Sequence, residues 1–254
     1  MTAIVGVFCD DGIVVGSDSS ATFSCGTTRT IEQPCRKIDI IADRIIVAGT
    51  GAAGLHQRFC DIVEQQHAAG MFDTPAYLQV GTALCAAAIH NFASTQVQQG
   101  QYGVLLGYAY DDASYLCEFD LATFQPEWKT ANIWYVSMGS GQPITDPFLG
   151  FMRRVFWQQG VPHVSDATFA VAWTLHHVIE LNPGGINAPL QVAILSKDSD
   201  SQQYQAKMLS DDELQQHMNN ITGAEDHLAQ YQIQPALPGD IGAEGADVPQ
   251  PPEV

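Results

Sequence analysis

The sequence predicts an α/β protein in which two β-sheets pack face to face and helices cover the outer side of each sheet. The first observation is the order of the expected elements, which runs strands, two helices, strands, two helices, strands and a final helix. A four-layer αββα sandwich is one layered solution to that order. The second observation is composition, because 46% of the 254 residues are hydrophobic and can form a sizeable core.

The first fifty residues predict strands joined by tight turns. Residues 2–9 are apolar and β-branched, and the Asp-Asp-Gly sequence at 10–12 is a strong hairpin signal. Residues 19–36 are small, polar and rich in hydroxyl groups, which indicates a loop or an irregular hairpin. The strands expected in this part of the chain cover residues 2–9, 13–18, 37–41 and 44–49.

Two helices are expected next, over residues 52–69 and 75–99. Apolar residues recur at helical spacing in both stretches. Thr74 is the expected N-cap of the second helix, because Pro75 suits the first helical position.

The second half of the chain repeats the alternation of strands and helices. The expected strands cover residues 102–110, 114–121, 132–138, 190–196 and 203–209. The expected helices cover residues 143–159, 165–181 and 211–231, with Ser165 as the cap of the second. We expect one domain over residues 1–231 and a flexible, acidic, proline-rich tail over residues 232–254. The alternative for the tail is a docking strand on a neighbouring subunit.

Charge excludes several classes of partner. The formal net charge is -18 and the chain has only 10 Lys and Arg residues, which argues against nucleic acid and against anionic membrane surfaces. The chain lacks an apolar run of the ~20 residues that a membrane helix needs. It also lacks the pattern of a secretory signal, so we expect a cytoplasmic protein.

The cysteines and histidines do not predict a metal site. The six cysteines are widely spaced and none forms a C-x-x-C pair, which favours buried, reduced thiols. His176 and His177 lack a carboxylate at ligand spacing, and no H-E-x-x-H motif is present. We therefore expect neither a metal nor a cofactor.

Thr2 is the first candidate for chemistry. Removal of Met1 would leave Thr2 with a free α-amine at the head of an apolar strand. A threonine hydroxyl is a poor nucleophile and needs an adjacent base. An α-amine titrates near pH ~8 and can take up the hydroxyl proton. One residue would then supply both the nucleophile and its base.

Four segments in order resemble the proteasome β-type subunits. The first is residues 2–7, with Asp18 following Thr2 at the separation that this family uses for its catalytic aspartate. The others are residues 36–38, which match the context of the family's catalytic lysine, residues 49–54 and residues 139–141. Together these matches are specific, although each alone is weak.

The resemblance covers about residues 2–210 and implies an N-terminal nucleophile hydrolase with an αββα sandwich. A short leader and the lack of long insertions resemble the bacterial branch. That branch includes the ATP-dependent two-component peptidase, the betaproteobacterial proteasome homologue and the ancestral β-like subunit. Chain length and the proline-rich tail fit the second of these better than the first.

The resemblance implies a role for each matching residue. Thr2 is the nucleophile, Lys37 stabilises its developing charge, Asp18 holds Lys37, and the Gly51 N–H donates to the oxyanion. Ser140 would bond the Thr2 amine and pass its proton. Residues implied near the substrate are Ala21, Thr22, Cys35, Ala53 and Gln57. The first two would pair with an extended peptide as an added strand.

The segment after the helix expected to end near residue 181 departs from the family pattern. The family often has an Asp and a Ser three apart there, whereas this chain has Asn-Pro-Gly-Gly-Ile at 182–186. Asn182 is the candidate substitute for part of that network. Asp18 as a turn cap and Lys37 as a solvated strand residue are the ordinary structural interpretations, and the family order favours catalysis over both.

The resulting hypothesis is a threonine endopeptidase that works inside stacked homo-oligomeric rings on peptides or unfolded chains. An ATPase partner is compatible with it. The first alternative is a ring subunit without activity. Inactive subunits of the family lack the Thr, Asp and Lys set, whereas this chain has Thr2, Asp18 and Lys37. The second is an amidase of the same fold, which would turn over small amides instead of peptides.

Overall fold

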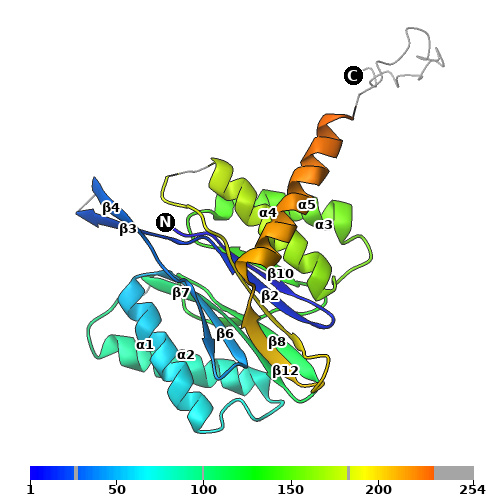
Figure 1. The fold of residues 1–254 in the computed structure, drawn as a ribbon. Helices are drawn as coiled ribbons and strands as arrows, with labels where there is room; N and C mark the ends of the chain where they lie inside the picture. The colour runs from blue at the N-terminus through cyan, green and yellow to red at the C-terminus, as the bar shows by residue number, and fades with distance from the viewer. Residues whose placement is uncertain (26–27, 99, 182–183, 232–254) are drawn as a thin grey trace, which may run out of the picture.

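The N-terminal strand pair lies at the centre of one five-stranded antiparallel sheet. The computed structural model describes residues 1–25, 28–98, 100–181 and 184–231 (Figure 1). The strands of this first sheet are, in spatial order, β10 (Tyr135–Met138), β1 (Ile4–Phe8), β2 (Gly12–Ser17), β11 (Gln191–Lys197) and β12 (Tyr204–Met208). Ile4 pairs with both Ser17 and Met138, so Thr2 lies beside the ends of two neighbouring strands.

A second five-stranded antiparallel sheet packs against the first. Its strands are, in spatial order, β5 (Ile38–Ile41), β6 (Ile45–Gly51), β7 (Tyr102–Tyr110), β8 (Ala113–Phe119) and β9 (Pro126–Trp128). β9 was not expected from the sequence, because it is only three residues long and begins with a proline. Gly51, at the end of β6, pairs with Tyr102.

Helices cover the outer face of each sheet (Figure 1). The five helices of the described residues are α1 (Ala53–Ala68), α2 (Tyr77–Ala93), α3 (Gln142–Phe156), α4 (Val164–Leu181) and α5 (Asp211–Ala229). α1 and α2 pack on the second sheet, α3 and α4 pack on the first, and α5 packs on α4. None of the described helices combines the length and the apolar character that crossing a bilayer requires.

Three buried apolar clusters fill the three spaces between the four layers. Strand β1 shows how the sequence divides between them, because successive side chains of a strand point to opposite faces. Ile4 packs between the two sheets, whereas Val5 and Val7 pack against the helices. Burying each such side chain contributes about 1.5–3 kcal/mol. The alternation therefore fixes which face of the sheet carries helices, and the αββα sandwich expected from the sequence is confirmed.

A separate two-stranded hairpin extends from the sandwich beside the N-terminus, at the left of Figure 1. It consists of β3 (Ser20–Cys25) and β4 (Thr28–Pro34), in the stretch where a loop or irregular hairpin was expected. Phe23 and Ile31 pair across it, and both are about half exposed. The hairpin thus presents apolar side chains to solvent.

Several predicted helix ends were wrong, for local reasons. α2 starts at Tyr77, because the Thr74 hydroxyl accepts the N–H of Ala76 in a turn that precedes the helix. It ends at Ala93, before Gln96 adopts a positive φ of 59°. Ser165 is not a cap, since α4 already begins one residue earlier and the N–H of Val164 donates to the carboxylate of the distant Asp11. The expected tail, residues 232–254, lies outside the described residues.

Candidate active site

Thr2 is held on both sides of its backbone by the turn between β10 and α3. Its N–H donates to Ser140 Oγ at 3.0 Å, and its carbonyl accepts the N–H of Gly141 at 3.0 Å. Gly139 has φ +92°, and a Cβ atom there would collide with the Thr2 carbonyl oxygen. A glycine is required at this position because the turn approaches Thr2 so closely.

A buried ion pair lies at the Thr2 side chain. Lys37 Nζ donates to Asp18 Oδ1 at 2.6 Å and to Thr2 Oγ1 at 3.3 Å. Asp18 has no solvent exposure and Lys37 is only 6% exposed. Asp18 also accepts the N–H groups of Ala3 and Ser20, at 2.9 and 3.1 Å. These charge-assisted bonds satisfy the buried carboxylate and aim the ammonium at the hydroxyl.

The Met1 carbonyl occupies the position next to the Thr2 hydroxyl. Thr2 Oγ1 donates to Met1 O at 2.7 Å, and Lys37 Nζ donates to the same oxygen at 3.1 Å. With Met1 attached, the nitrogen of Thr2 is an amide and cannot act as a base. A carbonyl oxygen placed here is within hydrogen-bond reach of both the hydroxyl and the ammonium.

Gly51 lies where the second sheet meets the site. It has φ +111°, and a Cβ atom there would collide with the Gln101 carbonyl oxygen. Two residues earlier, the N–H of Gly49 donates to the carbonyl of Lys37 at 3.3 Å, which places the end of β6 beside the catalytic candidates. Helix α1 begins at Ala53, directly after this strand. Helix N-termini present free N–H groups, which suits an oxyanion site.

Gln191 is a site residue that sequence reasoning missed. Its Oε1 accepts the backbone N–H of Lys37 at 3.0 Å, and its Nε2 donates to the Cys35 carbonyl at 2.7 Å and to Ser19 Oγ at 2.6 Å. One amide from β11 therefore fixes the segment that carries Lys37. The available signal was a polar residue at the start of an otherwise apolar strand.

The predicted substrate-side residues occupy three elements. Ala21 and Thr22 lie on β3, just after Ser20, whose N–H binds Asp18. Cys35 is half-buried, and burial raises the pKa of its thiol. The remaining two candidates, both on the first turns of α1 and both exposed, are Ala53 and Gln57. Asn182, the candidate for the missing network, lies outside the described residues.

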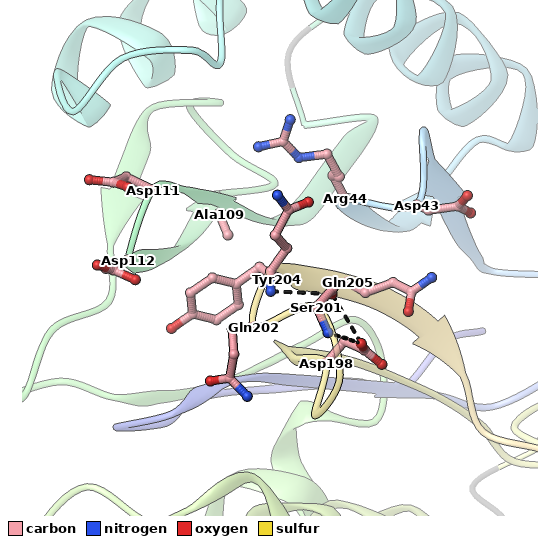
Figure 2. Close-up of a pocket in the computed structure, with 11 residues that line it drawn as sticks. Asp43, Arg44, Ala109, Asp111, Asp112, Asp198, Ser201, Gln202, Tyr204 and Gln205 are labelled. Carbon is pink, nitrogen blue, oxygen red and sulfur yellow. Dashed lines mark hydrogen bonds between the residues drawn. The ribbon is translucent and has the colours of Figure 1, made fainter.

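A polar pocket of about 610 Å³ lies at the opposite end of the sandwich (Figure 2). It is formed by three turns, which contribute Asp43, Asp111 and Asp198. Figure 2 shows the Ser201 hydroxyl and N–H directed at the Asp198 carboxylate, at 3.0 and 2.9 Å. The pocket is separated from Thr2 by the length of β2, about 20 Å for six residues. It therefore takes no part in the site around Thr2.

The four-layer fold is that of the N-terminal nucleophile hydrolases. A family model described as proteasome subunit matches residues 2–151, which is more than half of the chain. The chain therefore belongs to the proteasome subunit family. Sequence comparison with curated proteins found no significant match.

Solved structures with the same fold include three bacterial ancestral β-subunits (Anbu). Anbu from Yersinia bercovieri has a TM-score of 0.67 and 16% identity, covering 92% of this chain and 100% of that one. Anbu from Hyphomicrobium sp. strain MC1 has a TM-score of 0.65 and 12% identity, covering 92% and 100%. The structure titled as the helical assembly of the Anbu complex from Pseudomonas aeruginosa has a TM-score of 0.66 and 13% identity, and the match covers 92% of this chain and 98% of that one. At these identities the likeness shows the fold.

Proposed function

We propose that this protein is a threonine endopeptidase with Thr2 as its nucleophile once Met1 has been removed. The observation that carries the proposal is the position of Lys37, whose ammonium bonds both the buried Asp18 carboxylate and the Thr2 hydroxyl. Ser140 lies at hydrogen-bond distance from the Thr2 nitrogen, on the other side of the residue. Membership of the proteasome subunit family supports the same reaction class.

In the proposed reaction, the free amine of Thr2 accepts the proton of Oγ1 as that oxygen attacks the peptide carbonyl. The Lys37 ammonium stabilises the negative charge that develops on Oγ1, and the Gly51 N–H donates to the oxyanion. Collapse of the intermediate breaks the C–N bond, and the leaving amine takes the proton held by the Thr2 amine. Water, deprotonated by the same amine, then hydrolyses the acyl-ester and restores the hydroxyl.

The substrate we propose is an extended peptide that pairs with β3 at Ala21 and Thr22. Backbone pairing of this kind gives affinity without selecting one side chain. We further propose that the chain assembles with copies of itself, since the Pseudomonas aeruginosa structure of the same fold is titled as a helical assembly. Enclosure in an assembly would keep such a site away from folded proteins.

An electrophile selective for N-terminal threonine tests the proposal. We expect intact-mass spectrometry to show one adduct on protein that lacks Met1, and none on the Thr2→Ala variant. Thr222→Ala is the matched control, because Thr222 is an exposed threonine on α5, remote from the site, and it should label like the parent. Labelling that persists in Thr2→Ala would refute the assignment of Thr2 as the nucleophile. Turnover of small amides without peptide cleavage would replace the endopeptidase with an amidase.

A further inference from the structure

A cluster of three potential metal ligands lies beside the active site, on β5 and α1. His56 Nε2 is 2.8 Å from Asp39 Oδ2, and Cys60 Sγ is 3.8 Å from His56 Nε2 and 3.9 Å from the same carboxylate oxygen. His56 and Cys60 are four residues apart, so they share one face of α1. That face lies against β5, which supplies Asp39. The proposed peptidase reaction uses none of these groups.

The spacing of the three ligand atoms fits a tetrahedral cation. Zinc binds thiolate sulfur at ~2.3 Å and imidazole nitrogen or carboxylate oxygen at ~2.0–2.2 Å, which puts neighbouring ligand atoms about 3.3–3.6 Å apart. The observed separations of 2.8, 3.8 and 3.9 Å lie on both sides of that range. Side-chain shifts of about half an ångström would bring all three to bonding distance.

The environment of His56 orients it as a metal ligand. Its Nδ1 lies 2.8 Å from the hydroxyl of Tyr102, a side chain that is only 3% exposed. A Cβ atom at Gly49 would collide with Nδ1, so the glycine allows the ring to occupy this position. With Nδ1 held by the tyrosine, Nε2 faces Asp39 and Cys60. A second partner of this kind is typical of histidines that bind metals.

The charges around the cluster leave one carboxylate oxygen for a cation. Arg36 Nε lies 3.4 Å from Asp39 Oδ1, whereas Oδ2 faces the imidazole and the thiol. Cys60 Sγ lies on the same side of the carboxylate as the imidazole, 3.9 Å from Oδ2. Metals bind cysteine as the thiolate, so a cation bound here would displace the thiol proton.

We propose that Asp39, His56 and Cys60 bind one zinc-type divalent cation, with solvent as the fourth ligand. Solvent can reach the site because the side chain of Asp39 is 35% exposed. A carboxylate, an imidazole and a thiolate form a ligand set suited to zinc. The sequence alone predicts no metal, since Asp39 lies on another element, outside any short ligand motif. A cation here would join the strand that follows Lys37 to the helix that follows Gly51.

Cobalt substitution tests the proposal without any activity measurement. The full-length protein is titrated with Co²⁺, and thiolate ligation is followed by its near-ultraviolet charge-transfer absorption. We expect one equivalent of Co²⁺ and competition by Zn²⁺. Cys60→Ser should abolish the absorption, and Asp39→Asn should weaken binding. Tyr102→Phe, which removes only the partner of the imidazole, should weaken it by about 10-fold or more.

The matched control is the second group of potential ligands among the described residues, formed by Asp10, Asp11 and His163. All three are exposed, and His163 Nδ1 lies 2.7 Å from Asp10 Oδ1. We expect His163→Ala to leave stoichiometry and absorption unchanged. The proposal is overturned if the parent binds no equivalent of cobalt or zinc, if the absorption persists in Cys60→Ser, or if it is lost in His163→Ala. Circular dichroism establishes whether each variant is folded. If Cys60→Ser does not fold, the weaker binding expected for Asp39→Asn decides the test.

Discussion

Gln191 bonds three residues that meet at the candidate active site. Its amide bonds the N–H of Lys37, the carbonyl of Cys35 and the hydroxyl of Ser19. Lys37 itself is aimed by Asp18, so two different residues hold its backbone and its ammonium. Gln191 touches none of the reacting atoms, and it therefore acts as a positioning residue.

Replacement of Gln191 by leucine tests that role. Gln191→Leu leaves the Lys37 N–H and the Cys35 carbonyl without partners, and an unsatisfied buried group costs about 1–3 kcal/mol. We expect a loss of stability of that order and a fall in kcat of about 10-fold or more from a displaced lysine, with KM nearly unchanged. Gln205→Leu, on the neighbouring strand β12, is exposed and should change neither quantity. Equal kinetics for the two variants would contradict the role.

At the residue scale, the sequence predicted a candidate site from residue types that the proposed chemistry requires. Thr2, Asp18, Lys37 and Ser140 are in contact as the motifs predicted. Gln191 was missed because it lies 154 positions from Lys37, and only the pairing of β11 with β2 brings it there. Long-range contacts of that kind leave no local pattern.

At the scale of elements, strands were predicted better than helix ends. The apolar runs that became β1, β2 and β7 are buried along almost their whole length, so pattern and structure agree. Helix ends depend on single polar groups, and those groups can come from far away. Asp11 illustrates this, because its carboxylate accepts the N–H of Val164 at the start of α4. No inspection of the sequence around residue 164 would reveal it.

The start of α5 carries a complete capping box. Ser210 and Glu213 form a reciprocal capping box, and Lys207 donates to the same glutamate at 3.1 Å. These contacts lower the pKa of Glu213 to about 2, chiefly through its bond with the Ser210 N–H. A lowered pKa means that the stabilisation is complete above the ordinary value of 4.5 and is lost as pH falls towards 2.

The Glu213→Gln variant makes this pH dependence measurable. At pH 7 we expect the variant to be less stable by about 0.5–1 kcal/mol, the low end for a cap because the carboxylate is partly exposed. The difference should shrink between pH 4.5 and 2. Urea unfolding at several pH values provides the measurement. Asp212→Asn, one residue away in the same first turn, is the control and should give a smaller, flatter difference. A constant difference across this range would exclude the carboxylate as its source.

At the scale of the whole molecule, the hairpin of β3 and β4 stands apart from the sandwich (Figure 1). Phe23 is 48% exposed and Ile31 is 52% exposed, and the two lie opposite each other in the ladder. We propose that this exposed apolar pair belongs to a contact surface of the assembly. In the proposed assembly, a neighbouring copy of the chain covers them.

The double variant Phe23→Ser/Ile31→Ser should therefore dissociate. We expect analytical ultracentrifugation to show a smaller species than the parent at the same concentration, while the circular dichroism spectrum stays unchanged. Leu228→Ser is the control, because Leu228 is similarly exposed but lies near the end of α5. An unchanged mass in the double variant would show that the hairpin is not part of the interface.

The same hairpin carries Ala21 and Thr22, and its first residue is bonded to Asp18. Phe23 directly follows these two residues on β3, which we propose to be the strand that pairs with a peptide. In the proposed assembly, a neighbour that contacts Phe23 would also hold Ala21 and Thr22 in place. Dilution would then lower the specific activity, because dissociated subunits would keep the catalytic residues but bind the peptide more weakly. Turnover per subunit would rise with the concentration of the protein itself, without any other partner protein.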